Sequence, residues 1–254
     1  MTSTVVVGAA LGLAVGYATR PVSRVPTLLP ALPSPATARA SALYDRALST
    51  IASSIGFHYV AVFPGTETIV GDAARSAGRQ VVTFKSSYGL EAFTLLLDSN
   101  GTVYFQGNAA AVEDQLGVSA INSSKIENRW VALSRADGPY SDLEVGITVA
   151  DQSIFVPMIP TSTASVRVDG MTATQISGTV TAADDPASTA RLTIASGSDT
   201  PLAYASTAAT SGGGTTSTVT FSAWGTAVPV GTPSRAIAWS TIGASMPPGG
   251  YGSG

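Results

Sequence analysis

The chain has 254 residues, of which 44% are hydrophobic and 11% charged, with a net charge of −3 and no cysteine. Binding of nucleic acid requires clustered Lys and Arg side chains. The two lysines of this chain, Lys85 and Lys125, are far apart in the sequence. A nucleic-acid-binding role is therefore excluded. The absence of cysteine from this sequence excludes disulfides, thiolate metal sites, cysteine nucleophiles and a lipid-modified cysteine.

Residues 1–19 carry no charge and predict a membrane helix or signal anchor. A helix of this length rises about 28 Å, close to the thickness of a bilayer core. Gly8, Gly12 and Gly16 recur every four residues and predict a smooth face for packing against another membrane helix. Two alternatives stay open. One is a secretory signal, although no basic residue precedes the apolar run, and the other is a buried strand-turn-helix.

Residues 20–36 predict a stiff, extended tether, because each proline fixes its φ angle. Its prolines are Pro21, Pro26, Pro30, Pro33 and Pro35. Arg20 and Arg24 follow the apolar segment directly, and the positive-inside tendency would then place the C-terminal domain in the cytoplasm. This conflicts with export, and the sequence does not settle the topology.

The clearest predicted helix covers residues 40–55, where apolar residues recur at i, i+3, i+4 and i+7. Ser34 with Pro35, or Thr37, is a suitable start, and Gly56 is a suitable C-cap. The apolar stripe consists of Ala40, Leu43, Tyr44, Ala47, Leu48, Ile51, Ala52 and Ile55. The helix must bury this stripe against another layer, and we expect that layer to be a sheet.

Strands are predicted at residues 58–63, 80–84, 91–98 and 102–106 from β-branched and aromatic runs between turn residues. The last two flank Ser99-Asn100-Gly101. A two-residue Asn-Gly turn would place Leu97 opposite Tyr104, whereas a three-residue loop with a left-handed Gly101 pairs Leu97 with Val103. We prefer the second register because it keeps one apolar set together on one face. That set is Phe93, Leu95, Leu97, Val103 and Phe105.

The remaining pattern continues with short helices, a strand, an ambiguous stretch and then more strands. Short helices are predicted at 108–116 and 123–128, a strand at 130–134, a helix or strand within 140–158, five or six strands from 164 onward with a flexible hairpin tip at 212–214, and a disordered tail at 245–254. One antiparallel sheet with helices on one face accommodates this order. The predicted class is α+β.

No catalytic, cofactor or metal site is predicted. His58 opens a strand, and nothing near it in the sequence supplies the orienting carboxylate that a general base requires. The acidic pairs Glu113-Asp114 and Asp184-Asp185 are predicted to be solvated surface, because adjacent side chains point apart. The aromatic residues Trp130, Trp224, Trp239, Phe93, Phe105 and Phe221 are predicted mainly as core, with room for an apolar gap between layers.

The order of several short motifs resembles the LppX/LprG family of mycobacterial envelope lipoproteins over residues 36–242. These motifs are His58-Tyr-Val, GDAARSAGRQ, TVYFQGN, NRWVAL, SGTV, PLAYAS and TFSAWGTAVPVGTPS. The resemblance implies a curved antiparallel β half-barrel with helices on its concave face, enclosing an apolar cavity. It also implies a role in carrying or presenting acylated lipids. The family is anchored through an acylated cysteine, so here the apolar segment Val5–Ala18 would replace that anchor.

The sequence thus predicts a folded domain at 37–244 that binds a lipid or acylated glycolipid at the outer face of the cytoplasmic membrane. The alternative is a structural accessory subunit of a membrane complex, which docks through the N-terminal helix and the extracytoplasmic domain. The candidate cavity residues are Leu48, Ile51, Phe93, Leu95, Leu97, Val103 and Phe105.

Overall fold

The computed structural model describes residues 33–180, 188–208 and 214–243. The predicted membrane helix with Gly8, Gly12 and Gly16, most of the proline-rich tether, most of the hairpin tip, Asp184-Asp185 and the tail at 245–254 lie outside the described residues. Among the helices that are described, none combines the length and the apolar character needed to cross a bilayer.

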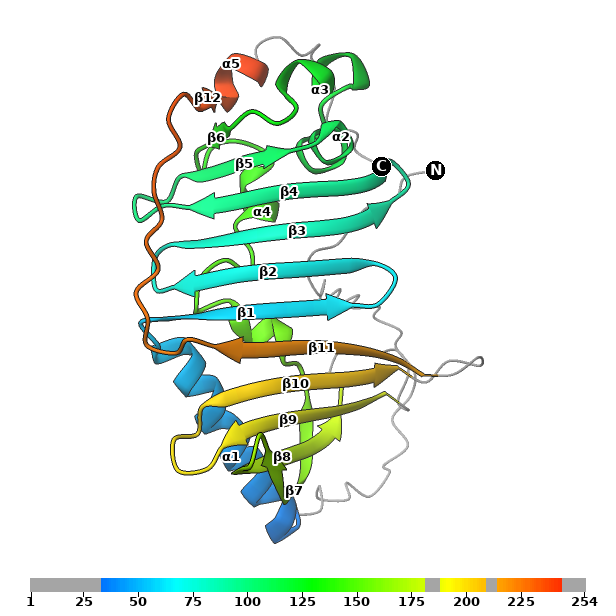
Figure 1. The fold of residues 1–254 in the computed structure, drawn as a ribbon, viewed down its shortest axis with the longest axis vertical. Coiled ribbons are helices and arrows are strands. Elements are labelled where there is room, and N and C mark those ends of the chain that lie inside the picture. Colours follow the sequence, from blue (N-terminus) through cyan, green and yellow to red (C-terminus); the bar gives the residue numbers. More distant parts are fainter. Residues whose placement is uncertain (1–32, 181–187, 209–213, 244–254) are drawn as a thin grey trace, which may run out of the picture.

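One twelve-stranded sheet organises the fold, in the order β12-β6-β5-β4-β3-β2-β1-β11-β10-β9-β8-β7 (Figure 1). Its strands are β1 (Gly56–Phe63), β2 (Glu67–Ala74), β3 (Gly78–Ser86), β4 (Gly89–Leu97), β5 (Val103–Gly107), β6 (Val131–Leu133), β7 (Ile159–Val168), β8 (Met171–Thr179), β9 (Thr189–Ala195), β10 (Pro201–Ala208), β11 (Thr215–Ser222) and β12 (Ile237–Ala238). Neighbouring strands are antiparallel except β12 and β6, which are parallel. The sheet is open, since β12 and β7 form its ends. The α+β class and the single, mostly antiparallel sheet are confirmed.

The helices lie behind the sheet and around its β12–β6 end in Figure 1. They are α1 (Pro35–Ser53), α2 (Ala109–Leu116), α3 (Ala120–Ile126), α4 (Tyr140–Leu143), the 3-10 helix η1 (Gln152–Phe155) and α5 (Trp239–Gly243). The predicted start of α1 is confirmed: the Ser34 side chain accepts a hydrogen bond from the Thr37 backbone N–H at 3.1 Å, and Pro35 opens the first turn.

The predicted end of α1 is wrong. The helix ends at Ser53, Ser54 is its C-cap, and Gly56 already belongs to β1. Glycine is required there for space, because a Cβ on Gly56 would lie 2.6 Å from the carbonyl oxygen of Thr226 and 2.8 Å from that of Ala73. Glycine is therefore needed at position 56 because two neighbouring chain segments leave no room for a side chain, and not because it caps the helix.

The predicted β4–β5 register is confirmed. Leu95 lies opposite Phe105 and Leu97 opposite Val103, and Gly101 in the connecting loop has φ 80°. The whole apolar set points into the core, with exposures of 6% or less. The Phe93 and Phe105 rings stack with their centroids 5.4 Å apart.

The helix that covers these apolar residues of β4 and β5 is not the expected one, however. Helix α1 packs on β7, β8, β10 and η1 at the other end of the sheet, whereas α2 covers β4 and β5. The sheet is extended beyond β1 by β11 through β7. The helix that precedes β1 therefore covers these C-terminal strands rather than β4 and β5.

The segment 140–158, ambiguous in sequence, forms α4 and η1 with irregular chain between them. Most of its large apolar side chains are core residues, namely Tyr140, Leu143, Ile147, Val149, Phe155, Val156 and Met158, whereas Ile154 is 39% exposed. Strand β2 (Glu67–Ala74) was not predicted at all, although it lies between β1 and β3 in the middle of the sheet.

Candidate functional site

The interior between sheet and helices is closely packed beside Phe93 and Leu95, where a cavity was expected. The gap beside Phe93 and Leu95 measures about 10 Å³ and is also lined by Val82, Ile69 and Leu143. A space of this size holds about one water molecule. The structure brings together the five candidate cavity residues of β4 and β5, but Leu48 and Ile51 belong to α1 and lie over the other half of the sheet.

A buried polar network connects the loop after α4 to the sheet at the edge of this interior. The Gly146 carbonyl accepts hydrogen bonds from the Tyr59 hydroxyl at 3.1 Å, from Gln80 Nε2 at 2.6 Å and from Gln152 Nε2. Gln80 Nε2 also lies 2.7 Å from the Tyr59 hydroxyl oxygen. Burial raises the pKa of Tyr59 above its ordinary value, so the phenol stays neutral and keeps its proton for this bond. The network ties the loop to β1 and β3.

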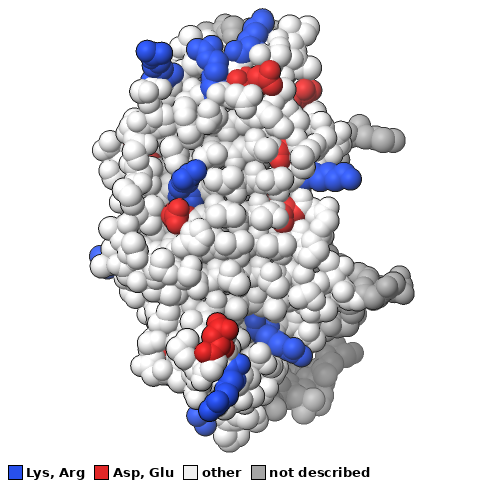
Figure 2. All heavy atoms as spheres, in the orientation of Figure 1, with Lys and Arg blue, Asp and Glu red and all other residues white. Residues whose placement is uncertain are grey.

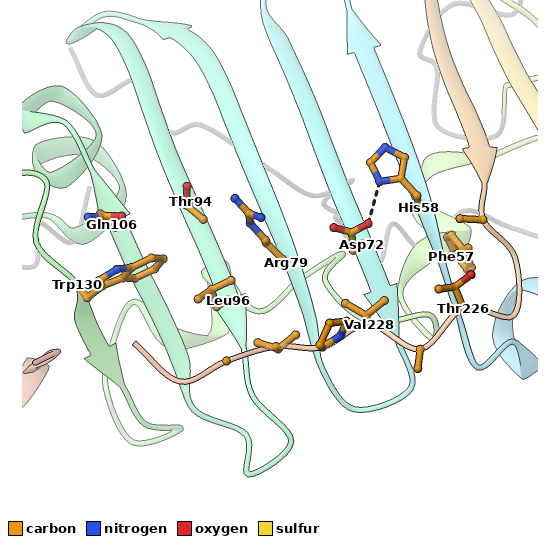
Figure 3. Close-up of a pocket in the computed structure, with 15 residues that line it drawn as sticks. Phe57, His58, Asp72, Arg79, Thr94, Leu96, Gln106, Trp130, Thr226 and Val228 are labelled. Atoms are coloured by element: carbon orange, nitrogen blue, oxygen red, sulfur yellow. Dashed lines mark hydrogen bonds and ion pairs between the residues drawn. The ribbon is translucent and has the colours of Figure 1, made fainter. Parts of the chain in front are cut away.

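A much larger space lies on the opposite face of the sheet. It is a groove of about 550 Å³ beneath residues 223–236, the segment between β11 and β12, which we call the strap (Figure 3). The strap starts beside β1, where Gly225 N–H donates to the Gly56 carbonyl at 2.9 Å. It ends beside β6, where Ile237 N–H donates to the Trp130 carbonyl at 2.8 Å. It therefore crosses the ends of the strands from β1 to β5.

Burial confirms that the strap covers the outward face. Leu96 and Tyr104 alternate with core residues and so point outward, yet they are only 9% and 7% exposed. Val70 and Val81 also point outward, but they are two residues away from Asp72 and Arg79 along β2 and β3. They lie beyond the strap and are 38% and 36% exposed. Burial also raises the pKa of Tyr104, whose hydroxyl is near Thr232 of the strap.

The groove floor contains a row of side chains that are directly opposite one another on adjacent strands. His58 is opposite Asp72, Asp72 opposite Arg79, and Arg79 opposite Leu96. The His58 Nδ1 and Asp72 Oδ1 atoms are 2.8 Å apart. The expectation that His58 lacks an orienting carboxylate is therefore wrong. Asp72 was missed because it belongs to β2, the strand that the sequence pattern did not reveal.

Apolar side chains line part of the groove, above its polar floor. Phe57 and Leu96 line it from the sheet, Trp130 closes the end near β6, and the strap contributes Val228 and Pro229. Trp130 was predicted as core but is only half-buried and faces the groove. A few polar groups, those of Thr94, Gln106 and Thr226, complete the lining.

Among the described residues, no nucleophile is held by the His58–Asp72 pair. Ser222 is opposite His58 on β11, but within the described residues no hydroxyl forms a hydrogen bond with the His58 ring. A His–Asp pair requires such a contact to activate a nucleophile. The described part of the chain also contains no group of three or more His, Cys, Asp or Glu residues placed to hold a metal ion.

Comparison with known proteins gives structural neighbours only. No protein-family model matches the chain, and no curated protein matches it. The crystal structure of LprF from Mycobacterium bovis is similar over 80% of this chain and 99% of its own, at 16% identity and a TM-score of 0.46. That of the lipoprotein LppX from Mycobacterium tuberculosis is similar over 77% and 99%, at 14% identity and a TM-score of 0.45.

Two of these neighbours are mycobacterial lipoproteins. The predicted resemblance is thus confirmed as a structural similarity at low sequence identity. A third structure, an uncharacterized conserved protein from Thermus thermophilus, is similar over 79% of this chain and 98% of its own, at 12% identity and a TM-score of 0.37.

Proposed function

We propose that this chain is a non-catalytic envelope protein that binds or presents a lipid at the outer face of the cytoplasmic membrane. In this proposal residues 37–244 form the binding domain, a curved half-barrel with its helices on the concave face. The observation that carries the proposal is the groove beneath the strap, which joins apolar side chains to a row of polar and charged groups.

The size and lining of the groove support this function. Its volume of about 550 Å³ lies within the range of roughly 300–1,000 Å³ that is usual for pockets holding one small molecule. Apolar walls with a few convergent polar groups are the usual composition of such pockets. The gap beside Phe93 and Leu95 is only about 10 Å³. A pocket of about 460 Å³ beside Leu97 and Tyr140 is lined mainly by polar residues, so the groove is the better candidate for the lipid.

Filling the groove tests its role. Thr94 points into the groove from β4. A Thr94→Trp substitution would place a large ring in the site. The amount of lipid that co-purifies with the protein in mild detergent should therefore fall by about tenfold or more. Native mass spectrometry measures the bound fraction. The matched control is Thr220→Trp, since Thr220 is an exposed residue on β11 outside the groove lining. Equal lipid occupancy in both folded variants would contradict a lipid site in the groove.

Attachment to the membrane is the second part of the proposal. Residues 1–19 carry no charge, so we expect full-length protein to remain in the membrane pellet after carbonate extraction. Deletion of residues 1–19 should move the protein to the supernatant. Recovery of the intact chain, residues 1–20 included, in the soluble fraction would show that the segment is not an anchor.

The alternative function is that of a structural accessory subunit of a membrane complex. It is favoured by the closed interior together with the sheet face beyond the strap, where Val62, Val70 and Val81 are 36%, 38% and 36% exposed. Native mass spectrometry separates the two functions, because bound protein subunits without lipid would support the accessory role.

A further inference from the structure

The charge distribution in the groove carries an inference about the ligand's head group. Among the residues that line the groove, Arg79 is the one Lys or Arg side chain, and Asp72 is the one carboxylate. Charged side chains are few on the face shown in Figure 2 and lie in small groups with uncharged surface between the groups. A charged ligand in the groove would therefore interact mainly with this pair.

The two charges differ in their availability. The Asp72 carboxylate is already paired with His58 at 2.8 Å. Arg79 is exposed, and within the described residues its guanidinium has neither an ion-pair partner nor a hydrogen bond, although Asp72 is directly opposite on the adjacent strand. A guanidinium has five N–H donors in a planar arrangement that matches a carboxylate or phosphate. The group free to bind a ligand is thus a cation.

The charge of the groove also changes along its length. Asp72 and Arg79 are on β2 and β3, whereas the end near β4 and β6 contains the apolar Leu96 and Trp130 beside the uncharged Thr94 and Gln106 (Figure 3). Arg79 and Leu96 are directly opposite each other in register, so their Cβ atoms are about 5 Å apart. An anionic head group on Arg79 would therefore place the first carbons of its chain on Leu96 and the rest toward Trp130, under the strap.

We propose that the groove binds a single-chain amphiphile with an anionic head group, a carboxylate or a phosphate, with Arg79 as the head-group anchor. The volume of about 550 Å³ fits one chain. This inference rests on the proposed function, because it specifies the ligand of the same groove.

The test uses four probes with the same dodecyl chain: dodecanoate, dodecyl phosphate, dodecanol and dodecyltrimethylammonium, each below its micelle concentration. Binding to the full-length protein is measured by isothermal titration calorimetry. We expect the two anions to bind more tightly than dodecanol and the cation. Arg79→Gln should weaken binding of both anions by roughly 10–100-fold, the range for charge-assisted hydrogen bonds, and leave dodecanol binding unchanged.

Two further variants control the result. Arg79→Lys should give intermediate anion binding, because it keeps the charge but loses the planar pair of donors. Arg191→Gln removes an exposed, outward-facing arginine from β9, outside the groove lining, and should have no effect. Dodecanol binding as tightly as the anions, tighter binding of the cation, or unchanged anion binding by Arg79→Gln would overturn the anionic assignment while leaving lipid binding intact. Failure of all four probes to bind, together with an absence of co-purified lipid, would overturn the proposed function itself.

Discussion

Replacing Leu95 by alanine should lower the free energy of unfolding by about 2–5 kcal/mol. The side chain is 4% exposed and lies in the core beside a gap of only about 10 Å³. Its removal loses buried apolar contacts and leaves a void that the stacked Phe93 and Phe105 rings cannot fill without moving. Chemical denaturation monitored by circular dichroism measures the change.

The matched control is Leu90→Ala on the same strand. Leu90 is 63% exposed, so its truncation should change stability by no more than about 0.5 kcal/mol. A loss below about 1 kcal/mol for Leu95→Ala would show that the interior is loosely packed there. The expected lipid site would then be the space between sheet and helices, lined by the residues first predicted from the sequence, rather than the groove.

Replacing Gly71 by alanine should destabilise the fold by about 3 kcal/mol, at the upper end of the usual cost of overpacking. A Cβ at this position would lie 2.3–2.5 Å from three atoms of the Tyr59 side chain, which is opposite Gly71 in the β1–β2 pairing. The Tyr59 ring is fully buried, and its hydroxyl is held by Gly146 and Gln80. The ring cannot move aside without breaking these buried hydrogen bonds.

A double-mutant cycle identifies the cause. In a Tyr59→Leu background the obstructing ring is gone, so the additional cost of Gly71→Ala should fall to well below its cost in the wild-type chain. Gly231→Ala is the control, because no atom lies within 4 Å of its added Cβ. Wild-type stability of Gly71→Ala, or an equal cost in both backgrounds, would disprove this packing.

Local patterns in the sequence determined α1 and the β4–β5 hairpin. The helix repeats apolar residues with its own period, and the capping residue Ser34 is next to it in sequence. The hairpin register follows from alternation and from Gly101 in the loop. Strand β2 gave no such signal, because its second half is Gly-Asp-Ala-Ala, residues with weak strand preference. The glycine in it is imposed by Tyr59 on the neighbouring strand.

Tertiary structure alone decided which surfaces meet. The amphipathic pattern of α1 shows that one face is buried, but the order of the strands decides that it packs on β7, β8 and β10. The groove requires His58, Asp72 and Arg79 to be side by side on three strands, and it requires the strap to return across them from well over a hundred residues later. The strap has no helical or strand period to reveal this, and its position is fixed by backbone hydrogen bonds to Gly56 and Trp130. Contacts of this kind depend on strand pairing between distant segments, and a periodicity within one segment contains no information about them.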